Sequence, residues 1–549
     1  MSFVIYCTVY LAELWKMGTT EKDVTPSDAG GKTETKSERD SEKGSCCLLA
    51  DKIPARYVLA ALFFVGHISM TISRGGFALA VVVMVNSSSR VTPVNQTNTY
   101  QLCPSSGPGN ASTQNDQGEL DWSESIKGVI LGAFFYGYIF TQVVGGLLEQ
   151  KFGCKIVYGT STLLGTVLSV LSPVASRTSP WAIFAVRFCM GLVSGVLFPC
   201  LYGIWGRWAP PTERTKLLAI CYIGLPLGNI INYPLSSFLA AQLGWEYIFY
   251  IPGASAAVWL VLWFLLGYDS PAQHPRILEE EKKYIEEGIG TNKRQKPKVP
   301  WLKVLTSPPV WALVMGQFSS NWGVFFLTTQ LPNYMQNVLG FNIQTNGLLS
   351  ALPFAVAMVC MFASSAAADR LIQGGKIPKV WIRRGFVITG YTGMVICGVI
   401  LANLSGCNPA AAVSLLCITQ GFNSLTVAGF RAVHVEFAPR FSGVTFALAN
   451  TGGTVSGIFA PLLVGLITDN YPTPAAWSTI FYIGAAIQGV GGIFTAVFLR
   501  TDVQPWARGE GDKGSFDKNV ELAGSKDLVI ANEHAEMPTK VVEMQNTKL

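Results

Sequence analysis

The chain has 549 residues, of which 50% are hydrophobic and only 13% are charged. The charged share is about half that of an ordinary globular protein, which is too little to cover the surface of a soluble protein of this size. The 40 Lys and Arg residues only slightly exceed the 34 Asp and Glu residues, and the excess is confined to certain loops, which argues against nucleic-acid binding. The composition therefore predicts a protein that is embedded in lipid.

The apolar residues gather in stretches long enough to cross a bilayer, which takes about 20 residues of helix. Taken in chain order, twelve stretches qualify or nearly qualify: 57–85, 126–148, 156–175, 181–205, 217–240, 247–267, 309–332, 346–368, 382–402, 409–434, 442–468 and 476–499. The charged, proline-containing segment 269–306 divides them into two sets of six. We therefore predict an all-α membrane protein with twelve transmembrane helices in two six-helix halves.

This pattern divides the chain into parts. The two ends are polar and poor in aromatic residues, a composition typical of disorder. The predicted parts are a largely disordered tail (1–54), the first six-helix half (55–268) with a lumenal loop (86–124), a linker (269–307), the second half (308–500) and a second disordered tail (501–549).

The distribution of basic residues predicts the orientation. One set of connecting segments holds almost all of the Lys and Arg, whereas the alternate set holds essentially only Arg90 and Arg177. Since basic loops stay in the cytoplasm, both termini and the linker are predicted to be cytoplasmic. The loop 86–124 on the other side carries three Asn-x-Ser/Thr sequons, of which Asn95 and Asn110 are the predicted glycosylation sites.

Two arginines interrupt the apolar stretches. Arg74 lies in the first span and Arg187 in the fourth, and both lie within about 20 Å of the lumenal span ends. An arginine in the middle of a spanning helix costs roughly 2.5–3.5 kcal/mol, and neither helix offers an obvious acid. A carboxylate or phosphate fits the planar fork of a guanidinium, so we predict that both bind an anionic substrate. The alternative is that either arginine pairs with backbone carbonyls or a distant acid and only holds helices together.

Further polar residues in the spans are weaker candidates for substrate contact. Gln317 and Asn321 are four residues apart and share a helix face. They could hydrogen-bond a polar substrate or simply bridge helices. Tyr136 and Tyr138 point to different faces of their helix, so at most one should face a cavity, and Tyr136 is the candidate chosen.

Two histidines are candidates for coupling or gating. His67 lies seven residues before Arg74, on the same helix face, and is either a contact for substrate or a proton, or a buried, hydrogen-bonded histidine. His434 lies near the cytoplasmic end of its span with Glu436 nearby, and either couples proton movement to a conformational change or latches the adjoining loop. Arg431 in the same span either pairs with Glu436 or adds positive potential to the cavity.

No pattern indicates an enzyme. The 4 His are scattered and form no catalytic or metal-binding cluster, and no phosphate-binding Gly-x-x-x-x-Gly-Lys-Ser/Thr loop is present. The 12 Cys show no paired metal-ligand spacing. A disulfide between Cys103 and Cys407, both predicted to face the lumen, stays open. No cofactor is expected other than sodium or a proton as the coupling ion.

The loops after the second span of each half carry related signals. The first runs from Gly146 and has Gln150 at its acidic position, whereas the second keeps Asp369 and Arg370. An acid–base pair here can latch a loop to a neighbouring helix end, so Asp369 and Arg370 are candidate gating residues. Together the two copies resemble the repeated loop signature Gly-x-x-x-Asp-Arg-x-Gly-Arg of the major facilitator superfamily.

A closer resemblance covers about 57–500 and is to the anion-transporter branch of that superfamily, which contains sialin, the vesicular glutamate transporters and the type I sodium–phosphate cotransporters. The segments that carry it are Ser73–Ala80, Arg187–Leu192, Trp205–Arg214 and His434–Pro439, and the Trp-Ala-Pro-Pro-x-Glu-Arg run is the most specific match. The resemblance implies the major facilitator fold, and it places substrate-binding arginines at Arg74 and Arg187.

The chain also departs from the family pattern. Met190 and Ser194 stand where sialin-like proteins carry acids, and Tyr202 and Ser320 stand where glutamate transporters carry a histidine and an arginine. A proton-coupled step through an acid of the fourth span is therefore not available, and vesicular loading of glutamate is disfavoured.

We expect a monomeric secondary active transporter of a small organic or inorganic anion, either a sialic acid-like carboxylate or phosphate, coupled to sodium or protons and working by alternating access. Its partners are the anionic substrate and membrane lipid, and the membrane is either the plasma membrane or a lysosomal or vesicular one. The alternatives are a non-transporting receptor or sensor on the same scaffold, and a vesicular transporter of acidic amino acids.

Overall fold

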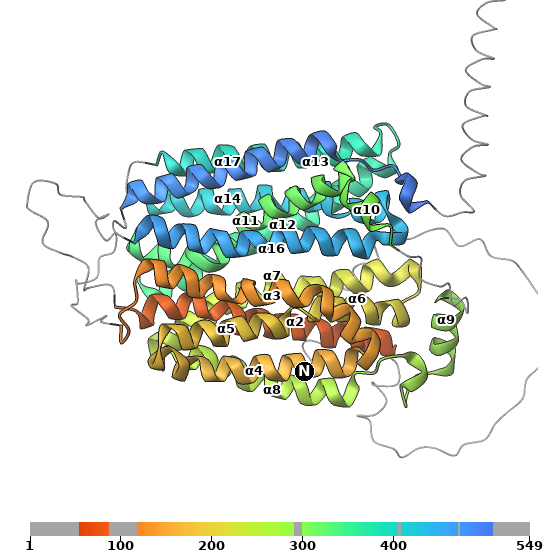
Figure 1. Cartoon of the computed structure of the whole chain (residues 1–549), viewed down its shortest axis with the longest axis horizontal. Helices are drawn as coiled ribbons and strands as arrows, with labels where there is room; N and C mark the ends of the chain where they lie inside the picture. The colour runs from red at the N-terminus through yellow and green to blue at the C-terminus, as the bar shows by residue number, and fades with distance from the viewer. Residues whose placement is uncertain (1–53, 87–117, 290–298, 405–407, 470–472, 509–549) are drawn as a thin grey trace, which may run out of the picture.

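Long helices that run along one axis make up most of the described part of the molecule. The computed structural model describes residues 54–86, 118–289, 299–404, 408–469 and 473–508. The helices of these residues fall into two layers, one built from the first half of the chain and the other from the second half (Figure 1). The two-layer arrangement has the form expected of two six-helix halves.

The first half consists of seven helical segments that make six spans. These are α2 (Ala55–Met84), α3 (Glu124–Phe152), α4 (Cys154–Thr178), α5 (Pro180–Ser194), α6 (Leu197–Trp208), α7 (Pro211–Gln242) and α8 (Tyr247–Leu266). α5 and α6 follow one another as a single span. α3 bends by 56° between Gln142 and Val144, just before the consecutive glycines Gly145 and Gly146, where a helix is easily deformed.

The second half repeats this plan. Its helices are α11 (Pro308–Asn337), α12 (Ile343–Gln373), α13 (Lys379–Ala402), α14 (Pro409–Thr426), α15 (Val433–Phe437), α16 (Ser442–Thr468) and α17 (Pro474–Phe498). Between α14 and α15, Val427–Arg431 forms η4, one turn of π-helix, so that α14, η4 and α15 make one span. Single π-helical turns within a helix occur frequently at functional sites.

Of the described helices, ten are long and apolar enough to cross a membrane, or eleven when the bent α3 is counted as one span. α11 is 30 residues long but is not among these helices, because it is more polar than the other spans. Much of it packs against α16 and α17 instead of facing lipid. Its buried polar residues are Gln317, Ser319, Ser320, Asn321, Thr328, Thr329 and Gln330. With α11 included, the described helices account for all twelve predicted spans.

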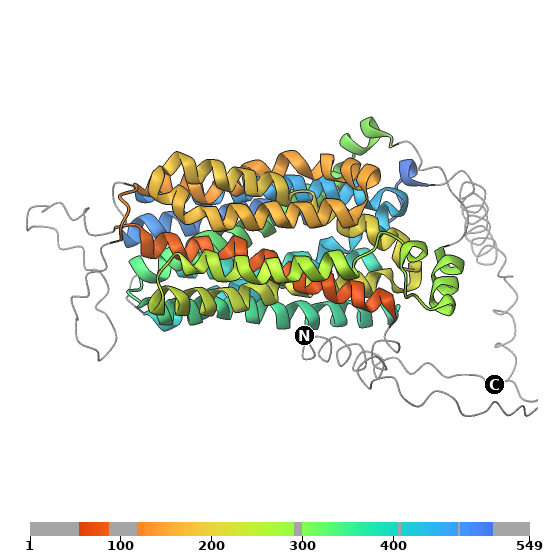
Figure 2. The same ribbon diagram turned by 90° about the horizontal axis from the view of Figure 1, so that it is seen from below.

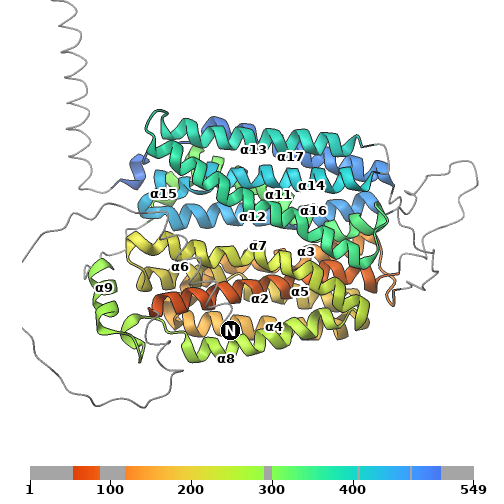
Figure 3. The ribbon, with the colours of Figure 1, turned by 180° about the vertical axis from the view of Figure 1, so that it is seen from behind.

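The short helices α9 (Glu279–Ile289) and α10 (Trp301–Leu305) lie at one end of the bundle, here called the linker end; both are labelled in Figure 1, and the same end is seen from other sides in Figures 2 and 3. α9 is anchored to the first half through Glu281, which accepts hydrogen bonds from the Ala55 amide at 2.8 Å and the Arg56 guanidinium at 3.1 Å. Ile285 of α9 is fully buried. The opposite end, where α2 ends at Met84, is here called the far end.

Ion pairs at the linker end tie helices together within each half. Glu149 of α3 is buried and accepts a hydrogen bond from Arg207 of α6 at 2.6 Å. Arg207 also donates to the backbone carbonyl of Asp269 at 3.0 Å. In the second half, Arg383 of α13 donates to Glu436 of α15 at 2.6 Å. Each pair fixes the relative position of two helices where they leave the bundle.

The predicted latch at Asp369 and Arg370 is wrong for this conformation. Both side chains are exposed at the end of α12, and among the described residues no ion pair involves either of them. In the first half, the acid that forms an ion pair with a neighbouring helix is Glu149, one residue before Gln150, which stands at the acidic position of the loop signature. The helical turn places Glu149 toward α6, whereas Gln150 is exposed.

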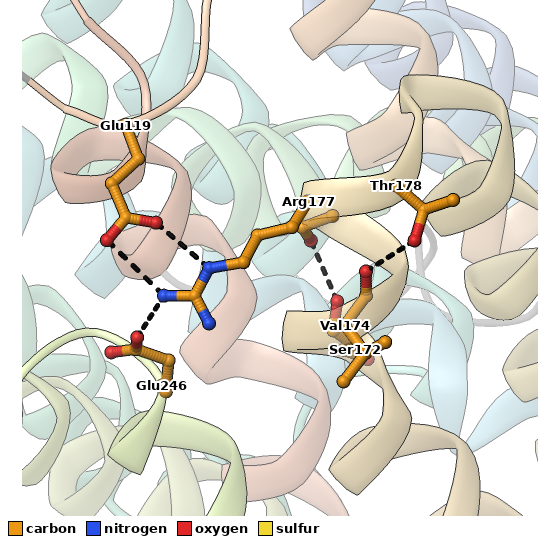
Figure 4. Close-up of polar contacts among 7 residues, drawn as sticks. Glu119, Ser172, Val174, Arg177, Thr178 and Glu246 are labelled. Atoms are coloured by element: carbon orange, nitrogen blue, oxygen red, sulfur yellow. Dashed lines mark hydrogen bonds and ion pairs between the residues drawn. The ribbon is translucent and has the colours of Figure 1, made fainter.

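Glu149→Gln is expected to lower stability more than Arg177→Ala. Loss of the charge on Glu149, whose side chain is 5% exposed, should cost about 1–3 kcal/mol, since its partner Arg207 stays beside it. Arg177 at the far end donates to Glu119 at 3.0 Å and contacts Glu246 (Figure 4), but its side chain is 45% exposed. Water screens this ion pair, so its loss should lower the free energy of unfolding by less than about 1 kcal/mol. Thermal unfolding of both variants in one detergent tests the ranking, and an equal or reversed order would contradict it.

The two halves meet most closely along α3 and α16. Near the far end, a Cβ placed on Gly128 would lie 3.1 Å from the Cα of Gly465. Midway along, the Gln142 side chain accepts a hydrogen bond from Asn450 and donates one to Thr454, both at 3.0 Å. Toward the linker end, Gly146 and Gly443 have open space around them instead. α3 and α16 are thus packed backbone to backbone at the far end, whereas toward the linker end their glycines face open space.

Candidate functional site

Arg187 is held by close packing of α5 against α3. Gly137 and Gly191 lie where the two backbones touch, and a side chain at either would overlap the facing helix. This approach lets the Arg187 Nε donate to the Ile130 carbonyl at 3.1 Å. The guanidinium lies 4.0 Å from the centre of the Phe77 ring, and the residue is only 4% exposed.

Arg74 reaches the same region from α2. Gly75 beside it allows α2 to pack closely on α7, because a Cβ added at Gly75 would lie only 2.8 Å from the Asn232 amide nitrogen. The Arg74 guanidinium lies over the rings of Phe134 at 5.1 Å and Phe135 at 6.0 Å. Aromatic faces carry partial negative charge and attract a cation, so these rings stabilise the guanidinium without neutralising it.

Both arginines line one small cavity. The other residues that line it are Gly75, Ala78, Leu131, Phe134, Phe135, Thr328 and Thr329. The two threonines belong to α11, so the cavity lies between the two halves. Among the described residues, no carboxylate lies within 4.0 Å of Arg74 or Arg187, so neither arginine forms an ion pair there. The arrangement is a doubly positive, aromatic-walled cavity whose charge suits an anion, and which in this conformation has room for about one water molecule.

Tyr138, and not Tyr136, faces this region. Tyr136 contacts Phe184 of α5, whereas Tyr138 is buried and stacks, with ring centres 5.7 Å apart, on Phe134, the ring over which the Arg74 guanidinium lies. The choice of Tyr136 is therefore wrong. Residues four apart lie on one helix face, which groups Tyr138 with Phe134 and leaves Tyr136 on the other side.

Gln317 and Asn321 do not line the arginine cavity. They are hydrogen-bonded to each other at 3.2 Å, and Asn321 also accepts from Arg431 at 3.4 Å. Asn321 precedes Thr328 by seven residues on α11, which corresponds to about 10 Å toward the linker end. The structure therefore separates these two residues from Arg74 and Arg187 along the axis of the bundle.

The two histidines are both buried. His67 makes a hydrogen bond with the Phe63 carbonyl at 2.7 Å and stacks on Tyr222, with ring centres 6.3 Å apart. His434 makes one with the Thr445 hydroxyl at 3.2 Å. The Nε2 atoms of both rings lack a hydrogen-bond partner.

Glu436 is not a partner of Arg431. Its carboxylate binds Arg383 at 2.6 Å and lies 3.9 Å from Lys379, at the linker end. Of the two alternatives for Arg431, the pair with Glu436 is therefore not formed. Residues five apart on a helix point in clearly different directions, so Arg431 contacts α11 while Glu436 contacts α13.

A second small cavity adjoins the first toward the far end. It shares Ala78, Leu131 and Thr329 with the arginine cavity, and Glu124 and Lys127 of α3 also line it. These two residues form an ion pair with each other in a largely buried position. The second cavity continues the line between the arginines and the far end of the bundle.

Two predictions concern residues that the structure does not describe. Asn95 and Asn110, the predicted glycosylation sites, lie outside the described residues, as do Cys103 and Cys407. The glycosylation of Asn95 and Asn110 stays a prediction, and the disulfide stays open.

The chain matches a known family of transporters. Residues 63–461 match the model of the Major Facilitator Superfamily. The chain belongs to this superfamily, whose members are transporters and not enzymes.

Individual relatives place the chain more narrowly. It is 37% identical over 455 residues to sialin of Homo sapiens, across 82% of this chain and 91% of that protein. It is 33% identical over 479 residues to vesicular glutamate transporter 1 of Xenopus laevis, across 86% of this chain and 80% of that protein. These similarities confirm the predicted anion-transporter branch, and with it a multi-pass membrane transporter.

The fold is also found among solved structures. A bacterial homolog of the human lysosomal transporter Spinster, in an inward-facing and unoccupied conformation, superimposes with a TM-score of 0.59 at 12% identity, over 82% of this chain and 99% of that one. At this identity the likeness concerns the fold, and it confirms the predicted major facilitator architecture.

Proposed function

We propose that the chain is a secondary active transporter that carries a small carboxylate or phosphate anion by alternating access, with Arg74 and Arg187 as its charge partners. The observation that carries this proposal is that both guanidinium groups line one cavity between the halves, with no described carboxylate within 4.0 Å of either.

The energetics favour an anionic ligand over a purely structural role. Each arginine in a spanning helix costs roughly 2.5–3.5 kcal/mol, and two like charges at one cavity raise the cost further. The hydrogen bond to Ile130 and the ring contacts offset this in part. An anion with two oxygens could accept hydrogen bonds from both forks, which are strongest when both partners are charged and water is excluded.

Alternating access requires that the cavity open to one side at a time, and the packing described here supports such a cycle. α3 and α16 are in contact at the far end and have open space around Gly146 and Gly443 at the linker end. Relative rocking of the two halves about a central site is the way in which such folds expose a substrate alternately to the two sides. We propose that the linker end is cytoplasmic, since most of the basic residues lie in loops on that side.

Uptake into proteoliposomes tests the proposal. Phosphate, sialic acid, glutamate and urate are compared, each under an imposed sodium gradient, proton gradient or membrane voltage. We expect accumulation of one class of anion under a sodium or proton gradient. Glutamate uptake driven mainly by voltage would favour the alternative of a vesicular acidic amino acid transporter. No accumulation of any of the anions, by protein that elutes as a single folded species, would contradict transport and favour a receptor or sensor.

A further inference from the structure

A third intramembrane arginine lies between the halves, nearer the linker end. Arg431 is the last residue of η4, and its guanidinium donates to the Asn321 side chain at 3.4 Å. Its Nε is buried without a hydrogen-bond partner, and no described carboxylate lies within 4.0 Å of it. One long hydrogen bond is little compensation for a cation withdrawn from water.

Other polar atoms around Arg431 also lack partners. Gln317 is 5% exposed and uses its NH2 group to bind Asn321, which leaves its carbonyl oxygen unpaired. His434, three residues after Arg431, is 2% exposed and has an unpaired Nε2. Buried polar atoms are nearly always hydrogen-bonded, by protein or by bound molecules. Several such atoms around one cation indicate a place for a ligand.

The first half of the chain supplies the facing wall. Tyr202 of α6 and Tyr222 of α7 share a hydrogen bond between their hydroxyls at 2.8 Å. The Tyr202 ring meets Phe446 of α16 with ring centres 5.5 Å apart, and Phe446 packs in turn on His434, three residues after Arg431, with ring centres 5.6 Å apart. The cluster is therefore divided between the two halves, as is the Arg74–Arg187 cavity.

We propose that Arg431, Gln317 and Asn321, facing Tyr202 and Tyr222, form a second anion-binding station between the Arg74–Arg187 cavity and the linker end. The station takes a carboxylate or phosphate that also bears a hydroxyl or amide hydrogen. Arg431 binds the anionic oxygens, and the unpaired Gln317 carbonyl accepts the neutral hydrogen bond. The proposal rests on the proposed function, since the same anion passes from one station to the other over about 10 Å.

Binding measurements on a variant without the first station isolate the second. Purified Arg74→Gln/Arg187→Gln protein is titrated with radiolabelled N-acetylneuraminate and, separately, with radiolabelled phosphate, at constant chloride concentration. We expect it to bind at least one of these anions, more weakly than the wild type does. Adding Arg431→Gln should weaken that residual binding about tenfold or more, the effect of losing one charge-assisted contact. Adding Arg431→Lys should weaken it less, because the positive charge stays.

Gln317→Glu provides an independent test with almost no change of shape. A carboxylate beside Arg431 would occupy the guanidinium, so adding this variant to the double variant should also remove the residual binding. Arg384→Gln is the matched control, since Arg384 donates to backbone carbonyls near the end of α17, away from the station, and it should change nothing.

The outcomes separate the two proposals. Equal binding with and without Arg431→Gln, or no binding by the double variant when the wild type binds, would overturn the second station and leave the proposed function intact. Transport by the Arg74→Gln/Arg187→Gln protein at the wild-type rate would overturn the proposed function alone. A wild type that binds neither anion would overturn both.

Discussion

Arg187→Gln is expected to lower uptake of the transported anion by about 100-fold or more in proteoliposomes, with the protein still folded. Truncating one partner of a buried charge pair typically costs about 2–5 kcal/mol, which corresponds to roughly 30- to 5000-fold in affinity. Glutamine keeps a donor that can reach toward the Ile130 carbonyl, and it removes the positive charge. Arg74→Gln should have an effect of similar size, since Arg74 lines the same cavity.

Stability measurements separate this role from a structural one. If the arginines bind substrate, their removal relieves the cost of a buried charge, so the melting temperature of the substrate-free protein should stay close to that of the wild type or rise. If Arg187 mainly holds α5 against α3, the melting temperature should fall together with uptake. Arg440→Gln is the matched control, because Arg440 is exposed at the linker end and far along the chain from the cavity. Wild-type uptake by both cavity variants would contradict the assignment.

The central arginines were predictable because a charge in an apolar stretch is visible in the sequence itself. Arg74 and Arg187 needed no knowledge of contacts to be singled out, and their shared cavity follows from the way the halves pack. Gln317 and Asn321 of α11 were visible in the same way, since they are polar residues four apart in an apolar stretch. Residues whose type is unusual for their surroundings can be found before the fold is known.

The errors concern direction and partner choice. Tyr136 and Tyr138 differ only in helical phase, and the phase was not fixed until the packing of α3 against α5 placed Phe134 and Tyr138 on the inner face. Glu436 could have paired with any basic residue at the linker end. Its pairing with Arg383, 53 positions earlier in the chain, depends on how α13 packs beside the end of that span. A pattern of residue types does not encode such a choice of partner.

Gly465→Val is expected to abolish transport while leaving the protein folded and able to bind its anion. In the conformation described here, a Cβ at position 465 would lie 2.6 Å from the Glu124 carbonyl and 3.1 Å from the Cα of Gly128. The contact is between backbones, which cannot move aside without separating α3 from α16. Valine should therefore prevent the far end from closing and hold the transporter with that end open, because a packed interface does not deform continuously.

The two readouts must diverge for this explanation to hold. Uptake into proteoliposomes should fall to background, whereas equilibrium binding of the anion to purified protein should stay within a few-fold of the wild type, since Arg74 and Arg187 are untouched. Gly385→Val is the matched control, because Gly385 lies in the membrane-spanning helix α13 with nothing within 4 Å of an added Cβ. Normal uptake by Gly465→Val would show that the far end does not close through this contact. Loss of binding together with uptake would mean that the substitution disrupts the cavity itself and not only the movement that exposes it.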